Sequence, residues 1–204
     1  MTLNLINFFD WFKSNLFYKP WLIVGKGPSF DRVADIDLDS YHVVGLNHVM
    51  FKIPCLLGHV IDFDVIKTSV SNNLCRHIVT PWEPHINFAP CGKTALNLFS
   101  DKSLSVNVPV LWYNSSRSSK LMIQSGPVVR VKLFSAVAAV NLLASSGVKE
   151  IFTLGVDEGT EYSKAFDDKS RLANGRLSFK GQYNEFKLAS KTFGVSVKPL
   201  FKVP

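Results

Sequence analysis

The sequence lacks any apolar run long enough to cross a membrane, and it contains only three cysteines. A membrane-spanning helix needs about 18 consecutive apolar residues. Cys55, Cys75 and Cys91 form no CxxC pair and lack metal-ligand spacing, which predicts reduced thiols in a reducing compartment. A signal-peptide pattern is also missing, because Asp10 and Lys13 interrupt the apolar N-terminal stretch. These absences favour a cytoplasmic protein over a secreted or membrane-spanning one.

Dense blocks of basic residues are absent as well, although the formal net charge is +7. An excess of positive charge favours anionic partners such as phosphates, nucleic acid or an acidic membrane surface. Because no nucleic-acid module signature accompanies the charge, we expect no nucleic-acid partner. A hydrophobic fraction of 47% and a charged fraction of 19% are typical of a globular fold with a substantial core. The length predicts one domain rather than two.

The first twenty residues are rich in aromatic side chains and predict a helix over 1–20, followed by a single domain over 21–204. On a helix, Leu5, Phe8, Phe9, Phe12 and Leu16 share one face. Two interpretations stay open. Either this helix packs against the core, or residues 1–18 dock on a partner or on the inner face of a membrane as a peripheral arm.

Apolar strands alternate with helical segments along the rest of the chain. This alternation predicts an α/β, Rossmann-like fold with a mainly parallel sheet and flanking helices. The stretches 82–108 and 158–180 look irregular and are long enough to form lid-like insertions. After the first strand, WLIV, the expected strands are 41–48, 55–63, 76–81, 109–114, 150–157 and 195–201, and the expected helices are 132–146 and 182–193.

The strongest local motif is Gly25-Lys26-Gly27-Pro28-Ser29, which directly follows the first apolar strand. Two glycines let backbone N–H groups approach a phosphate closely, and Lys26 adds a positive charge. Asn47 and His48 close the second strand, so they should lie at the same edge of the sheet, where open α/β sheets bind ligands. The sequence therefore predicts a nucleotide site at this edge. The motif matches neither GxGxxG nor the P-loop, so a purely structural turn stays an alternative.

Carboxylates follow two further predicted strands. Asp62 and Asp64 come at the end of 55–63, and an aspartate pair is a candidate magnesium ligand set. Asp157 ends 150–157 and is followed by Glu158. A carboxylate at that position would suit a sugar hydroxyl, or it would cap the following loop.

The order of these motifs resembles the bacterial sialyltransferases of glycosyltransferase family 42, over roughly 21–50 and 132–202. GKGPS resembles the family's Gly-Asn-Gly-Pro-Ser turn, and Leu46-Asn47-His48 resembles its Cys-Asn-Gln segment. The most specific matches are SAVAAVNLLASSGVKEIFTLGVD and the following YSKAFDDK. The resemblance implies transfer of a sialic-acid-like sugar from a CMP-sugar donor to a glycan or glycolipid acceptor, with no metal ion or other cofactor required.

By this resemblance the donor pocket is lined by Gly25, Lys26, Gly27, Ser29, Asn47, Ser135 and Tyr162, with Tyr162 in the lid. Three places depart from the family, one of them near Lys132 and Phe134, where the family carries Arg and Thr and the donor contact is therefore altered. Lys26 replaces an asparagine, and Lys180-Gly181-Gln182 occupies the place of the glycine and catalytic histidine. Glutamine cannot accept a proton near neutral pH.

Three explanations of Gln182 stay open. His48, Asp157 or Glu158 acts as the catalytic base instead, the alignment shifts, or the chain is not a competent sialyltransferase. Two other functions therefore remain alternatives: a magnesium-dependent pyrophosphokinase-like enzyme that uses Asp62 and Asp64, and a non-catalytic nucleotide-sugar-binding protein.

Overall fold

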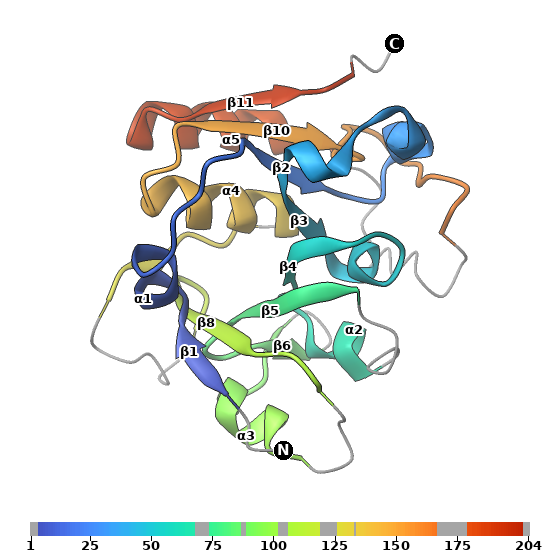
Figure 1. The fold of residues 1–204 in the computed structure, drawn as a ribbon. Coiled ribbons are helices and arrows are strands. Elements are labelled where there is room, and N and C mark those ends of the chain that lie inside the picture. Colours follow the sequence, from blue (N-terminus) through green and yellow to red (C-terminus); the bar gives the residue numbers. More distant parts are fainter. Residues whose placement is uncertain are drawn as a thin grey trace.

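The computed structural model describes residues 4–67, 74–86, 89–101, 106–118, 126–132, 134–166 and 179–201. A parallel sheet runs through the molecule in the order β1-β8-β5-β4-β3-β2-β10-β11, and β9 pairs with β8 (Figure 1). The strands of this sheet are β1 (Leu5–Asn7), β2 (Trp21–Val24), β3 (His42–Leu46), β4 (Cys55–His59), β5 (Cys75–Pro81), β8 (Val110–Ser115), β9 (Val128–Val129), β10 (Glu150–Leu154) and β11 (Ser196–Pro199). The predicted α/β class with a mainly parallel sheet is confirmed.

Strand β2, in the interior of the sheet, is apolar throughout because both faces of the sheet are covered. All of Trp21–Val24 is buried, and Ile23 lies opposite Val44 on one side and Thr153 on the other. A parallel strand buried on both faces reads as a continuous hydrophobic run rather than an alternating one. The sequence WLIV therefore belongs at the centre of the sheet.

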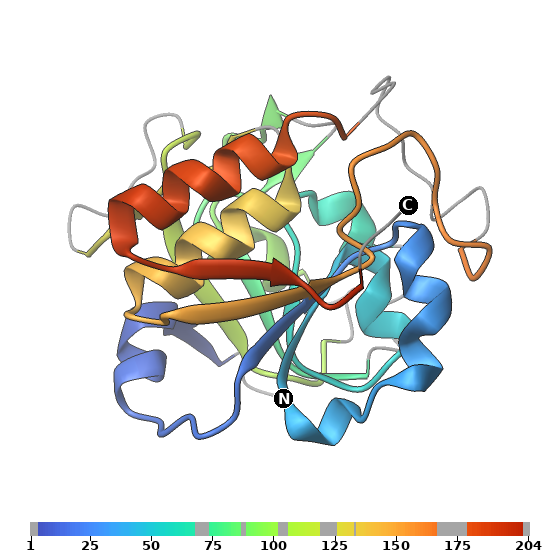
Figure 2. The ribbon, with the colours of Figure 1, turned by 90° about the horizontal axis from the view of Figure 1, so that it is seen from above.

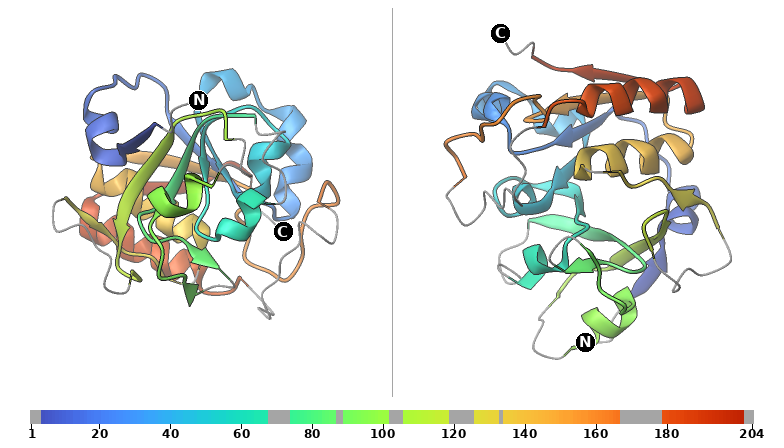
Figure 3. Two further views of the ribbon diagram at one scale, coloured as in Figure 1. Left: turned by 90° about the horizontal axis from the view of Figure 1, so that it is seen from below. Right: turned by 180° about the vertical axis from the view of Figure 1, so that it is seen from behind.

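Helices cover the two faces separately (Figures 2 and 3). One face carries α1 (Phe8–Lys13), α4 (Ser135–Ser145) and α5 (Gln182–Phe193), whose buried residues form one apolar cluster with the sheet. The other face carries a second cluster, to which the remaining helices contribute. These are η1 (Pro28–Asp35), η2 (Leu38–Ser40), η3 (Asn47–Phe51), α2 (Phe63–Lys67) and α3 (Ala95–Phe99).

The prediction of one helix over 1–20 is wrong. Leu5–Asn7 instead pairs with β8 as an edge strand, with Leu5 opposite Val110, and the helix spans only Phe8–Lys13. The side chain of Asn7 ends the strand and begins the helix, since its Oδ1 accepts a hydrogen bond from the N–H of Phe9 at 2.9 Å.

The aromatic residues of α1 point into the molecule. Phe8 and Phe9 are buried in the cluster that contains α4, and Phe12 lies 5.8 Å from Trp21, ring to ring. This packing matches the interpretation in which the segment docks on the core. The membrane interpretation gains no support, because it requires the same side chains on the outside. No helix in the described part of the chain has the length and hydropathy to span a bilayer.

Two stretches expected to be irregular differ from each other. Residues 82–108 contain the antiparallel pair β6 (His85–Ile86) and β7 (Ala89–Pro90), and also α3, which begins with a capping box of Thr94 and Asn97. Residues 158–166 have no helix or strand. The remainder of the expected lid, 167–178, lies outside the described residues.

Candidate functional site

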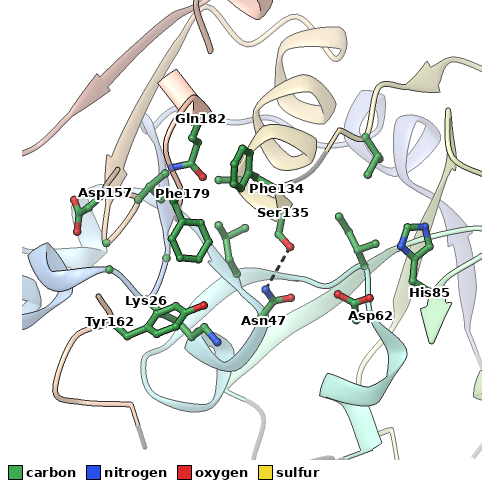
Figure 4. Close-up of a pocket in the computed structure, with 18 of the residues that line it drawn as sticks. Lys26, Asn47, Asp62, His85, Phe134, Ser135, Asp157, Tyr162, Phe179 and Gln182 are labelled. Carbon is green, nitrogen blue, oxygen red and sulfur yellow. Dashed lines mark hydrogen bonds between the residues drawn. The ribbon is translucent and has the colours of Figure 1, made fainter. Parts of the chain in front are cut away.

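A cavity opens at the carboxyl ends of β2, β3, β4 and β10, where the chain leaves four neighbouring parallel strands (Figure 4). The N-termini of α4 and α5 close it from above the sheet. The residues that line the cavity include Gly25, Lys26, Gly27, Asn47, Asp62, His85, Arg117, Phe134, Ser135, Asp157, Tyr162, Phe179 and Gln182. The prediction that the glycine turn and Asn47 converge at one sheet edge is confirmed.

The glycine turn (residues 25–29) packs closely against the loop that follows β10, with direct contacts between the two backbones. The N–H of Gly25 donates to the carbonyl of Leu154 at 2.8 Å, and that of Gly27 donates to the carbonyl of Gly155 at 2.7 Å. A Cβ on Gly25 would lie 2.3 Å from the Gly155 oxygen, a distance too short for any residue other than glycine. Gly155 itself has a φ of +61°, in the left-handed region. Both glycines are thus needed to form the floor of the cavity.

Hydrogen bonds between Ser29 and Asp157 stabilise this turn. The Asp157 carboxylate accepts two hydrogen bonds from Ser29, one from the backbone N–H and one from the hydroxyl, both at 2.8 Å. The Ser29 hydroxyl oxygen accepts a further bond from the N–H of Gly155 at 2.7 Å. Ser29 was expected to line the donor pocket but does not line the cavity. Asp157 lines it, with both carboxylate oxygens already engaged.

Lys26 supplies a positive charge to the cavity. Burial lowers the pKa of Lys26 to about 8, so the ammonium is still mostly protonated at neutral pH. Its Nζ lies 4.9 Å from the ring centroid of Tyr162, a cation–π distance. The N–H of Ser163 donates to the Lys26 carbonyl at 2.8 Å, which fastens the loop of Tyr162 to the glycine turn. Lys26 and Tyr162 lie side by side in Figure 4.

Asn47 and Ser135 meet across the cavity. The Asn47 amide nitrogen donates to the Ser135 hydroxyl at 3.3 Å, whereas its buried Oδ1 has no hydrogen-bond partner among the described residues. Asn47 has a φ of +51°, a conformation that asparagine tolerates better than most residues. Ser135 is the first residue of α4, and Phe134 before it provides no side-chain cap. The positive end of α4 therefore faces the cavity.

Three aromatic rings form one wall. Phe179 lies 5.9 Å from Phe134 and 5.6 Å from Tyr162, centroid to centroid, with the second pair edge to face. Such a wall offers flat apolar surface to a planar ligand group. The family resemblance places Phe134 near an altered donor contact, whereas Phe179 was not expected at the site.

The far side of the cavity holds Asp62, which was considered as a magnesium ligand, together with His85 and Arg117, which were not expected at the site. A bridge joins the backbones of Asp62 and His85, and the N–H of His85 donates to the carbonyl of Ile61 at 2.8 Å. Burial, with a smaller effect of Arg117, lowers the pKa of His85 to about 4, against an opposing effect of Glu83. His85 was expected to be structural because the histidines of the sequence lack metal-ligand spacing.

Two of the three expected catalytic residues do not line the cavity. His48 is buried in η3, with its ring 6.1 Å from that of Phe51. Glu158 is engaged at the start of α5, where its Oε1 accepts from the N–H groups of Gly181 and Tyr183, both at 3.0 Å. Glu158 therefore caps the second helix that points at the cavity. Gln182 does line the cavity and is almost fully buried.

Only one of the two aspartates considered for magnesium lies at the cavity. Asp62 lines the cavity, but Asp64 is in α2 and lies 3.9 Å from the Nζ of Lys67. Among the described residues, no group of three or more His, Cys, Asp or Glu side chains is arranged to hold a metal ion. Within the described part of the chain, Cys55, Cys75 and Cys91 form no disulfide.

No family model matches this chain, and neither does any curated protein. Among solved structures, the fold is similar to that of the sialyltransferase CST-II, crystallised in complex with a trisaccharide acceptor and CMP. The TM-score is 0.55, and the match covers 89% of this chain and 81% of that one, at 16% sequence identity. At this identity the likeness establishes a sialyltransferase-like fold.

Proposed function

We propose that this chain is a glycosyltransferase that binds a CMP-linked, sialic-acid-like sugar in the cavity and transfers the sugar to a glycan acceptor. The observation that carries the proposal is the meeting of Lys26, the glycine turn, Asn47 and the α4 N-terminus at one sheet edge. Each of these features suits a phosphate, and together they suit it far better than any one alone. The sialyltransferase-like fold supports glycosyl transfer as the reaction.

The two ends of the cavity suit different parts of such a donor. The positive end is formed by Lys26 and the uncapped N–H groups of α4, which would bind the phosphate that leaves. Phe134 and Phe179 offer flat surface for a pyrimidine ring, and the unpartnered Oδ1 of Asn47 is an acceptor for a ligand hydroxyl or amine. Asp62 and His85, on the opposite side, would face the sugar and the incoming acceptor (Figure 4).

Catalysis in this site would be mainly electrostatic. As the bond between the anomeric carbon and the phosphate oxygen breaks, negative charge grows on the phosphate. A lysine and oriented N–H groups that are already in place stabilise this charge without reorganising, and such preorganised donors commonly contribute the largest part of the rate enhancement. Burial of Lys26 strengthens the effect because water screens the charge less.

A magnesium-dependent pyrophosphokinase is less well supported, since Asp64 lies outside the cavity and is near Lys67. Calorimetry with CMP, UMP, AMP and GMP, each with and without magnesium, separates the two functions. Selective binding of CMP that ignores magnesium supports the proposal. Selective binding of a purine nucleotide that requires magnesium would contradict it.

Turnover is tested next with CMP-N-acetylneuraminate, by following CMP release with water alone or a panel of soluble oligosaccharides as acceptors. We expect release that depends on the protein and rises with a suitable oligosaccharide. Tight binding of the donor with no release for any acceptor would indicate the non-catalytic alternative.

A further inference from the structure

We infer that His85 is the general base of this site, accepting the proton of the acceptor hydroxyl in place of the family histidine that the sequence resemblance aligns with Gln182. The inference rests on the proposed function and names the residue that completes it. It starts from three observations: His85 lines the cavity, its Nε2 is buried without a hydrogen bond among the described residues, and it lies across the cavity from Lys26 (Figure 4).

The position of His85 suits an inverting displacement. In such a reaction the nucleophile enters on the side of the anomeric carbon opposite the leaving group, so the base and the phosphate-binding groups lie at opposite ends of the site. Lys26 and Tyr162 mark the phosphate end, and Figure 4 shows Asn47 and Asp62 between them and His85. A sugar held at Asn47 would therefore have its acceptor side toward His85.

The state of the imidazole also suits a base. A buried polar atom without a partner costs roughly 1–3 kcal/mol, so Nε2 is set up for a partner that enters with the substrate. The pKa of His85 is lowered to about 4, which leaves the ring neutral and its lone pair available at neutral pH. Burial is the largest cause of this low pKa, Arg117 lowers it further and Glu83 acts in the opposite direction, while Asp62 is joined to His85 by the backbone bridge.

Substrate binding would raise the pKa of His85 and so make it a stronger base. The donor brings at least one negative charge into the cavity, and a nearby negative charge stabilises the imidazolium and raises its pKa. A base is most effective when its pKa approaches the working pH. An uncharged imidazole also avoids the repulsion that a carboxylate base would exert on an anionic donor.

The other basic groups at the site are worse placed. Both oxygens of Asp157 accept hydrogen bonds from Ser29, and Glu158 caps α5 outside the cavity. Gln182 has no basic atom near neutral pH. Asp62 is the remaining competitor and is included in the test.

The proposed step balances as follows. The acceptor oxygen forms a bond to the anomeric carbon while its proton passes to Nε2 of His85. The bond from the anomeric carbon to the phosphate oxygen breaks, and its electron pair leaves with CMP. The imidazolium then returns its proton to water. No metal ion, oxidant or reductant takes part.

The test uses the full chain with His85→Gln, His85→Ala and Asp62→Asn, and with His42→Gln, which lies outside the cavity, as the matched control. CMP binding by calorimetry and circular dichroism report whether each variant is folded with an intact phosphate end. We expect His85→Gln to bind CMP within about twofold of wild type while CMP release from CMP-N-acetylneuraminate falls about 10²- to 10⁴-fold, as for loss of a general base. His42→Gln should retain full activity.

Chemical rescue separates a base from a positioning residue. Added imidazoles should restore release by His85→Ala, and the restored rate should rise with the basicity of the imidazole used. Unchanged release by His85→Gln, a rescue independent of basicity, or a loss confined to Asp62→Asn would each overturn the inference while leaving the glycosyltransferase proposal intact. If wild type itself neither binds CMP nor releases it, the proposed function fails instead.

Discussion

The charge on Lys26 makes a specific prediction about how CMP affinity depends on pH. The pKa of Lys26 is about 8 in the folded chain, against 10.5 for an ordinary lysine, and the cause is burial. A bound phosphate would stabilise the ammonium and raise this pKa again. Protonated Lys26 therefore binds the phosphate better than neutral Lys26, and CMP affinity should fall as pH rises through about 8.

The size of the effect follows from the protonated fraction. With a pKa of about 8, roughly 90% of Lys26 is protonated at pH 7 and roughly 10% at pH 9. CMP affinity should therefore fall about tenfold over this interval, or about 1.4 kcal/mol. The phosphate of CMP loses its second proton near about pH 6, so the ligand itself does not titrate in this range.

Calorimetric titrations of CMP at pH 7, 8 and 9 measure this dependence, with Lys26→Met as the variant and Lys164→Met, on the exposed loop after β10, as the control. Lys26→Met should bind CMP about tenfold or more weakly at pH 7 and show no pH dependence. Wild type and Lys164→Met should both show the full slope. An identical slope in Lys26→Met would refute the assignment of Lys26 to the phosphate.

The same pKa predicts a cost in stability. Because the folded-state pKa lies below the unfolded value, the unfolded chain binds more protons between about pH 8 and 10.5. Stability contributed by this group therefore rises with pH across that window. Without ligand, Lys26→Met should unfold at a higher temperature than wild type at pH 7, and scanning calorimetry that shows a lower Tm would contradict the account.

Three further predictions concern the frame of the cavity. Asp157→Asn should lower the free energy of unfolding in urea by about 1–3 kcal/mol, because one of the two hydrogen bonds from Ser29 loses its acceptor. The control Asp35→Asn breaks only the exposed ion pair with Arg32 and should change the free energy of unfolding little. Equal effects of the two variants would count against the role of Asp157. Gly25→Ala should destabilise the fold and abolish CMP binding, because its Cβ would lie 2.3 Å from the Gly155 oxygen. The control Gly159→Ala should be tolerated, since its Cβ meets nothing within 4 Å. If Gly25→Ala still binds CMP, the turn is not closely packed. Gln182→His should partly restore CMP release in the His85→Gln background, because it returns a basic group to the cavity. A double variant that is as inactive as His85→Gln would contradict this prediction.

The elements that the sequence predicted well are those with local signals. Helix α5 spans Gln182–Phe193 as expected, since Gly181 and Gly194, with φ values of +91° and +65°, lie at its two ends. The position of the cavity was likewise predictable, because the carboxyl ends of parallel strands must share one edge.

The features that the sequence did not predict depend on contacts between distant residues. Ser29 and Asp157 are 128 positions apart, so no local pattern shows that they bond to each other rather than to a ligand. His85 lies at the cavity through backbone contacts with Ile61 and Asp62, which are more than twenty positions away, and its own stretch of sequence has little periodicity. Residues Leu5–Asn7 form a strand only because the edge of β8 is open to them.

A crystal structure of the chain soaked with CMP is the most direct test of the central claim. The account predicts CMP in the cavity, with its phosphate within about 3 Å of the Nζ of Lys26 and near the first N–H groups of α4, and with its cytosine against Phe134 or Phe179. CMP bound elsewhere on the molecule, or a phosphate turned toward His85 rather than Lys26, would contradict it.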